Sequence, residues 1–62
     1  GRTINQFILE VKMNKSKKLI TQTNMKIKEI SDKMGYSNQN YFTRTFTKYF
    51  GVTPSTFRNK RL

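Results

Sequence analysis

The sequence predicts an all-α fold, in which a long first helix is followed by three shorter helices that form a homeodomain-like unit. Apolar residues recur at intervals of three and four in three separate segments, which is the period of an amphipathic helix. Glycine and proline fall at the borders of these segments, where they end or begin helices.

The first helix is predicted from about Ile4 to Gln22, with Thr3 as its N-cap. Its apolar residues repeat at helical spacing, and we expect them to face the core: Ile4, Phe7, Ile8, Val11, Leu19 and Ile20. Ser16 is small, so another helix can approach closely there. The polar side carries Lys12, Lys15, Lys17 and Lys18. Such a lysine run is either a solvated face or a set of phosphate contacts, and a flexible point charge suits both uses.

A short second helix is predicted from the apolar stripe of Ile27, Ile30 and Met34, with Asn24 as its cap. The helix is expected to stop at Gly35, and Tyr36 is expected to fill the corner that follows. Three residues, 35–37, then join it to the next helix, and this is the turn length of a helix-turn-helix unit.

The third helix is predicted over about residues 38–50, capped by Ser37 and ended by Gly51. One stripe of this helix is expected in the core: Phe42, Phe46, Tyr49 and Phe50. The opposite stripe carries Gln39, Asn40, Thr43, Arg44 and Thr47. It has no carboxylate that would repel phosphate, whereas an ordinary solvated face more often mixes Glu with Lys. The alternative, that these are ordinary surface residues, stays open.

The last helix is predicted to begin with Thr53 as its cap and Pro54 at its first position, where proline's missing amide hydrogen costs nothing. Phe57 is then expected to return to the core, and a basic tail follows it.

Composition narrows the possible functions. The 62 residues carry a net charge of +10 and contain no histidine and no cysteine, so neither a zinc site nor a histidine-based triad can be assembled. The only acids are Glu10, Glu29 and Asp32. We therefore expect no enzyme, no metal and no cofactor, but one small domain that binds a polyanion. No apolar run is long enough for a membrane span.

Several motifs at fixed spacing support a resemblance to a known family. They are Ile27-Lys28-Glu29-Ile30, Gly35-Tyr36-Ser37, Tyr41-Phe42, Phe46, Tyr49-Phe50-Gly51, Thr53-Pro54-Ser55 and Phe57-Arg58. In these the chain resembles the C-terminal DNA-binding region of the AraC/XylS family of bacterial transcription regulators. The resemblance implies a linker helix at residues 1–23 and a second helix-turn-helix unit at residues 24–62, together one small domain of a longer regulator. It also implies that the third helix is a recognition helix that lies in a major groove.

The expected function is sequence-specific binding of double-stranded DNA. We expect Arg44 to contact a guanine edge and Asn40 or Gln39 an adenine edge, while threonines touch a thymine methyl or a phosphate. The candidate base contacts are Gln39, Asn40, Thr43, Arg44 and Thr47. The candidate phosphate contacts are Lys26, Ser37, Asn38, Lys48 and Arg58.

Two alternatives remain at this stage: a cationic module that binds nucleic acid or another polyanion without specificity, and a helical protein-interaction domain. The resemblance implies a cytoplasmic regulator, an activator that works with RNA polymerase, although the residues themselves do not distinguish activation from repression. The pattern G-x-T-x-x-x-F occurs at residues 1–7 and again at residues 51–57. Because the second copy closes a helix-turn-helix, we expect Gly1 to close another one immediately upstream.

Overall fold

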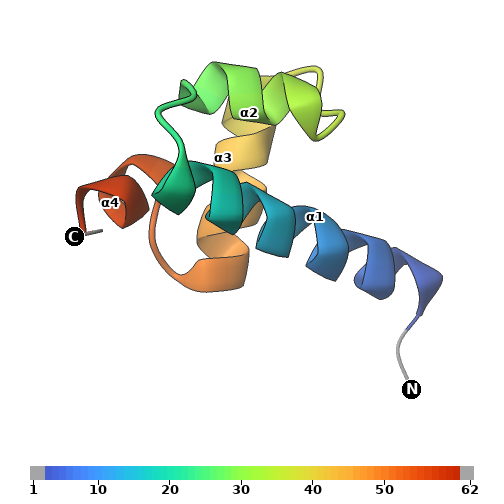
Figure 1. Cartoon of the computed structure of the whole chain (residues 1–62). Helices are drawn as coiled ribbons and strands as arrows, with labels where there is room; N and C mark the ends of the chain where they lie inside the picture. Colours follow the sequence, from blue (N-terminus) through green and yellow to red (C-terminus); the bar gives the residue numbers. More distant parts are fainter. Residues whose placement is uncertain (1–2, 61–62) are drawn as a thin grey trace.

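The computed structural model describes residues 3–60, which form four helices and no strand (Figure 1). They are α1 (Ile4–Gln22), α2 (Ile27–Lys33), α3 (Gln39–Phe50) and α4 (Pro54–Asn59). The predicted all-α fold and the order of its helices are therefore confirmed. Gly1, which the internal repeat singles out, and the end of the basic tail lie outside the described residues.

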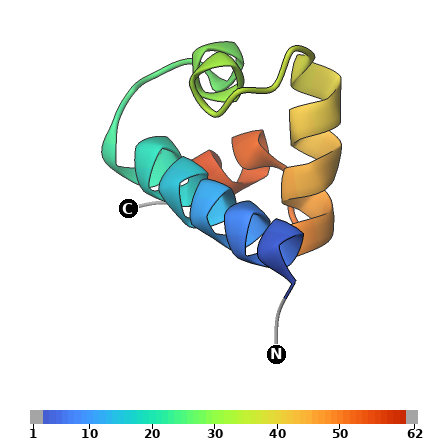
Figure 2. The ribbon, with the colours of Figure 1, turned by 90° about the vertical axis from the view of Figure 1, so that its right-hand side faces the viewer.

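The helices of the helix-turn-helix are arranged crosswise, with α2 lying over one end of α3 (Figure 1). α1 runs diagonally past both, and α4 packs against α1 and α3 (Figure 2). The N-terminal half of α1 extends beyond the other helices. This arrangement leaves one long side of α3 facing away from the rest of the molecule.

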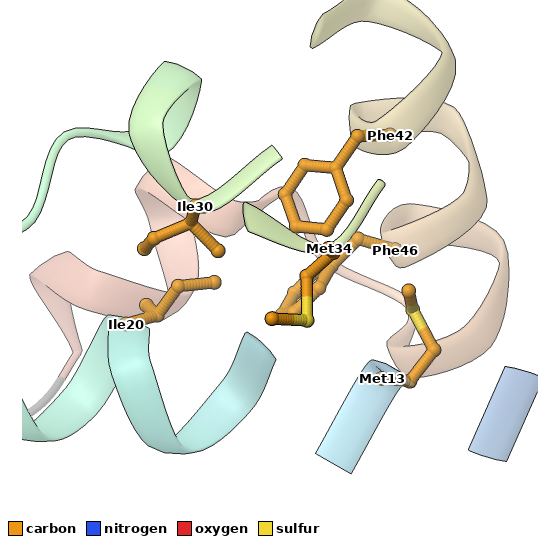
Figure 3. Packing of buried hydrophobic residues seen from close by; sticks show 6 residues of the cluster. All are labelled: Met13, Ile20, Ile30, Met34, Phe42 and Phe46. Atoms are coloured by element: carbon orange, nitrogen blue, oxygen red, sulfur yellow. The ribbon is translucent and has the colours of Figure 1, made fainter. Parts of the chain in front are cut away.

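The core lies where α1, α2 and α3 meet (Figure 3). Its buried hydrophobic residues are Met13, Ile20, Ile30, Met34, Phe42 and Phe46. Phe46 is at the centre of an aromatic cluster, since its ring centroid lies 4.6 Å from that of Phe50, 5.7 Å from that of Phe57 and 6.0 Å from that of Phe42. The contact between Phe46 and Phe57 joins α3 to α4, so α3 is held by side chains on its inner face.

The prediction for the buried face of α1 was largely wrong. Four of the residues expected in the core are 45–79% exposed, and we call them the outer stripe: Ile4, Phe7, Ile8 and Val11. The buried face is instead formed by Met13, Ser16 and Ile20, with Leu9 half-buried beside them. Ile20 follows Val11 by nine residues, or about two and a half helical turns. The two residues therefore point in opposite directions, and α1 has two apolar faces, only one of which is covered by residues 3–60.

Tyr49 was also wrongly predicted as a core residue, because its side chain is 41% exposed. It lies at the edge of the buried stripe of α3, where its ring meets that of Phe50 at 4.8 Å in a T-shaped contact. Phe42 and Phe46 are fully buried, as predicted, and Phe50 and Phe57 are half-buried against them.

Local hydrogen bonds account for the helix starts. Thr3 caps α1 as predicted: its hydroxyl accepts from the amide of Gln6, and the Gln6 side chain accepts from the amide of Thr3. Thr53 caps α4 in the predicted way, accepting from the amide of Thr56 at 3.1 Å. The predicted cap of α2, Asn24, is wrong, because α2 begins after Lys26. The amide of Lys26 donates to Glu29 Oε1 at 3.2 Å, so the glutamate supplies the contact at this helix start.

Between the C-cap of α2 and the N-cap of α3 the turn has the three predicted residues, 35–37, although α2 itself ends at Lys33 and α3 begins at Gln39. After the C-cap Met34, Gly35 adopts a left-handed φ of 88°. Its amide donates to the Asp32 carbonyl at 3.0 Å, and the amide of Tyr36 donates to the Ser31 carbonyl at 3.0 Å. This pair of bonds is a Schellman motif, which turns the chain sharply. Tyr36 fills the corner as expected, with its ring centroid 5.4 Å from that of Phe42.

Candidate nucleic-acid interface

Two capping residues set the start and the end of α3. Asn38, not the predicted Ser37, is the N-cap of α3, and its side-chain oxygen accepts from the amides of Asn40 at 2.7 Å and Tyr41 at 3.3 Å. The two residues are neighbours and both are good cap formers, so the sequence alone did not separate them. At the other end, Gly51 stops the helix with a left-handed φ of 82°.

All five predicted base-contact residues lie on α3. Gln39, Asn40 and Arg44 are exposed, whereas Thr43 and Thr47 are half-buried. The hydroxyl of Thr47 donates to the carbonyl of Thr43 at 2.7 Å, so that hydrogen is used within the helix. The exposed amide and guanidinium groups are consequently the members of this face best placed to reach a ligand.

The predicted phosphate contacts are not gathered in one place. Ser37 and Asn38 lie at the N-terminal end of α3, where the helix dipole favours an anion, while Asn38 Oδ1 already accepts from the amides of Asn40 and Tyr41. Lys48 is exposed in the last turn of α3, and Lys26 is exposed at the start of α2. Three of these residues belong to the two ends of α3, whereas Lys26 belongs to the start of α2.

Arg58 has a structural role. Its guanidinium, carried by α4, donates from Nε to the carbonyl of Ile20 at 3.1 Å and from Nη2 to the carbonyl of Thr23 at 3.2 Å. These carbonyls lie at the C-terminal end of α1, where helical carbonyls have no partner within the helix and a cation is favourable. Arg58 thus joins the last helix to the first.

A hollow that the sequence analysis did not find lies beside the outer face of α3. We call it the tyrosine groove; it has a volume of about 460 Å³ and is lined by Leu9, Tyr36, Tyr41, Thr45, Lys48 and Tyr49. Tyr41, Thr45 and Tyr49 are spaced four residues apart, so they form a further stripe of α3 between the buried face and the outer face. That spacing is the signal that could have indicated the groove, but Tyr49 had been attributed to the core.

The walls of the tyrosine groove are connected by ring contacts. The centroids of Tyr36 and Tyr41 are 5.7 Å apart, and the ammonium of Lys12 lies 5.2 Å from the centroid of the Tyr36 ring. Burial, and secondarily the neighbouring Tyr41, raise the pKa of Tyr36 above its ordinary value of 10.0. The Tyr36 hydroxyl therefore keeps its proton at neutral pH and can donate a hydrogen bond.

Within residues 3–60, no three side chains of the metal-binding types gather at one place. None of the four described helices is both long and apolar enough to span a membrane.

Three features define a helix-turn-helix domain: α2 and α3 cross each other, three residues lie between their caps, and the outer face of α3 carries no acid. Comparison with known proteins agrees: a family model for a helix-turn-helix domain matches residues 1–60. The chain belongs to the helix-turn-helix domain family of the AraC/XylS type. It is thus a DNA-binding domain of a transcription regulator, not an enzyme.

Two relatives illustrate the match. The HTH-type transcriptional activator FapR of Escherichia coli is 43% identical over 53 residues, which are 86% of this chain and 20% of FapR. The xylose operon regulatory protein of Haemophilus influenzae is 44% identical over 58 residues, which are 94% of this chain and 15% of that protein. The chain thus spans a fifth or less of these relatives.

Solved structures show the same fold. The C-terminal domain of AraT, a response regulator from Geobacillus stearothermophilus, has a TM-score of 0.94 and 32% identity, covering 100% of this chain and 51% of that one. The C-terminal domain of the two-component response regulator yesN from Fusobacterium nucleatum has a TM-score of 0.90 and 34% identity. It covers 94% of this chain and 56% of that one.

Proposed function

We propose that the chain binds double-stranded DNA in a sequence-specific manner, with α3 lying in the major groove as the recognition helix. The observation that carries this proposal is the outer face of α3. Gln39, Asn40 and Arg44 are exposed there, while Phe42 and Phe46 anchor the opposite face in the core. Amide and guanidinium groups can pair with the edges of adenine and guanine in two hydrogen bonds each.

Phosphate contacts then orient the domain without selecting the sequence. We assign this role to four exposed polar or cationic residues at the ends of α3 and the start of α2: Lys26, Ser37, Asn38 and Lys48. We leave Arg58 out of this set, since two nitrogens of its guanidinium already donate to carbonyls of α1 and the following segment. Thr43 and Thr47 remain in the base-contact set, where their methyl groups suit a thymine methyl.

Arg44→Ala tests the proposal. The substitution should cost roughly 1 to 3 kcal/mol of binding free energy on the preferred duplex and much less on unrelated DNA. The preferred duplex is first selected from a random library with the full-length protein. Lys28→Ala is the control, because it removes an exposed cation from α2 and leaves α3 unchanged. Equal losses on both DNAs would make Arg44 a phosphate contact.

A binder that relies on charge alone is the main competitor for this function. In a competition experiment, a preferred duplex should displace the protein from bulk DNA at far lower concentration than unrelated duplex does. If the two duplexes compete equally, the +10 chain is a non-specific polyanion binder.

We further propose that a preceding helix-turn-helix unit packs on the outer stripe of α1. In this proposal residues 1–23 are the linker helix and residues 24–62 the second unit. Four exposed apolar side chains at helical spacing are what a helix presents to a packed partner. Two units would read major-groove segments about one DNA turn apart.

The test compares duplex binding by these 62 residues with binding by a version extended upstream by about fifty residues, the spacing of the internal repeat. Equal affinity and selectivity would contradict the two-unit proposal.

The remaining proposals concern the whole regulator. We infer an activator that works with RNA polymerase in the cytoplasm, in keeping with relatives that are named transcriptional activators. Reporter transcription with purified polymerase would test this, and repression of the target promoter would contradict it.

A further inference from the structure

The tyrosine groove has the chemistry of a site for a sugar–phosphate chain. Three tyrosine hydroxyls can donate to phosphate oxygens, and the tyrosine rings offer apolar surface to a sugar. The hydroxyl of Thr45 already donates to the carbonyl of Tyr41 at 2.9 Å, so Thr45 only lines the wall. None of the six lining residues is acidic, so nothing in the lining would repel a phosphate. Tyr41 is 62% exposed and Tyr49 41% exposed, so both rings are accessible to a ligand.

Cationic side chains stand on both walls of the groove. Lys48 lines the wall formed by α3. On α1, Lys12 follows the lining residue Leu9 by three positions and therefore lies on the same side of that helix. Its ammonium is held over the ring of Tyr36, 5.2 Å from the centroid. Of the four lysines of α1, Lys12 alone is half-buried, whereas Lys15, Lys17 and Lys18 are exposed. None of the four is among the six lining residues, and Lys12 adjoins the groove through its contact with the ring of Tyr36.

The groove is continuous with the outer face of α3. Lys48 lies one helical turn beyond Arg44, and Tyr41 directly follows Asn40. A helix inserted in a major groove is flanked by the two strand backbones that border that groove. The groove lies between α3 and α1, because it is lined by four residues of α3 and by Leu9 of α1.

We propose that the tyrosine groove binds the sugar–phosphate backbone of one DNA strand, with Lys12 and Lys48 as phosphate contacts on its two walls. This inference rests on the proposed function, because it requires α3 to enter the major groove. It also identifies Lys12 as the lysine of α1 that contacts DNA, while the other three lysines of that helix remain solvated.

The test uses the full-length protein, its preferred duplex and a series of salt concentrations from about 0.05 to 0.3 M. Lys12→Gln should reduce the slope of log affinity against log salt by about one, and should weaken preferred and unrelated duplexes alike. Lys12→Arg, which keeps the charge, should preserve the slope. Lys15→Gln is the matched control, since it removes the same charge from an exposed position of the same helix and should leave the slope unchanged.

Ethylation of single phosphates in the duplex then locates the contact. Ethylation at one or two neighbouring phosphates of one strand should interfere with binding by the unsubstituted protein, and Lys12→Gln and Lys48→Gln should each abolish that interference. If Lys12→Gln destabilises the fold, Lys12→Arg and Lys48→Gln still test the site. The inference is overturned if Lys12→Gln lowers the melting temperature without changing DNA binding, or if Lys15→Gln reduces the slope of log affinity against log salt as much as Lys12→Gln does. It is also overturned if ethylation interference assigns Lys12 and Lys48 to distant phosphates.

The outcome is separable from that of the proposed function. If the Arg44→Ala variant loses selectivity while the Lys12→Gln variant keeps the slope of log affinity against log salt, α3 reads DNA but the tyrosine groove does not bind the DNA backbone. If Arg44→Ala loses no selectivity on any duplex, the proposed function itself fails.

Discussion

Replacing Arg58 with alanine should destabilise the domain, although Arg58 belongs to a short helix near the end of the chain. The substitution removes two hydrogen bonds, to the carbonyls of Ile20 and Thr23. Hydrogen bonds from charged groups contribute about 1.5–3 kcal/mol each. Because Arg58 is half-buried and water can hydrogen-bond to the carbonyls once the guanidinium is removed, we expect about 1–1.5 kcal/mol per bond, at or below the lower end of that range. The expected loss is roughly 2–3 kcal/mol for the pair.

Thermal unfolding followed by circular dichroism measures this effect. In a domain of this size each kcal/mol shifts the melting temperature by about 4–8 °C, so Arg58→Ala should melt roughly 8–24 °C lower. Arg44→Ala is the matched control, because it removes the same side chain from an exposed position of α3. Arg58→Lys should recover little, since one ammonium cannot reproduce the planar fork that reaches two carbonyls.

Two results would refute the reasoning. If Arg58→Ala and Arg44→Ala melt at the same temperature, the bonds to α1 contribute nothing to stability. If Arg58→Ala, measured below its melting temperature, reduces the salt dependence of DNA binding by about one in slope, Arg58 is a phosphate contact after all.

Three further predictions concern single side chains. Phe46→Ala should cost about 3–5 kcal/mol in urea unfolding, because it empties a fully buried site that packs on three other rings. Ser31→Ala should leave the urea midpoint unchanged or raise it, since Ser31 Oγ is buried without a hydrogen-bond partner among the described residues. Stability should fall as pH rises above 10.0, because the pKa of Tyr36 is raised in the folded state and the unfolded chain releases that proton first; Tyr36→Phe should flatten this part of the pH profile.

Each of these predictions has an outcome that contradicts it. An unchanged urea transition in Phe46→Ala would place that ring outside the core. A loss of more than about 1 kcal/mol in Ser31→Ala would show that the hydroxyl has a hydrogen-bond partner. An alkaline loss of stability that is equally steep in Tyr36→Phe would assign the titration to other groups.

Helix positions were predictable where their signals are local. Thr3 and Thr53 act within three residues of themselves, and Gly35 and Gly51 adopt left-handed conformations that glycine tolerates best. The bounds of α1 and the outer face of α3 followed from such signals, combined with helical periodicity. The base contacts assigned to that face stay predictions, since they depend on a partner that the chain alone does not contain.

Features that depend on distant parts of the chain were not predictable in this way. Both apolar faces of α1 have helical spacing, so periodicity alone did not show which of them α2, α3 and α4 would cover. The hydrogen bond from Arg58 to the carbonyl of Ile20 joins residues 38 positions apart, and no local sequence pattern predicts it. The tyrosine groove likewise requires Leu9 of α1 to lie opposite α3, which is a property of the tertiary structure.

The two apolar faces of α1 have a mechanical consequence. The covered face, through Met13 and Ile20, is fixed to the core that holds α3, and the outer stripe belongs to the same rigid helix. Any unit that packs on the outer stripe is therefore held at a fixed rotation about the axis of α1 relative to α3. One residue inserted between Val11 and Met13 would turn one face against the other by about 100° and move it by about 1.5 Å. The number of residues in this helix thus sets an angle as well as a distance, and an insertion here would be far more disruptive than one of equal length in a loop.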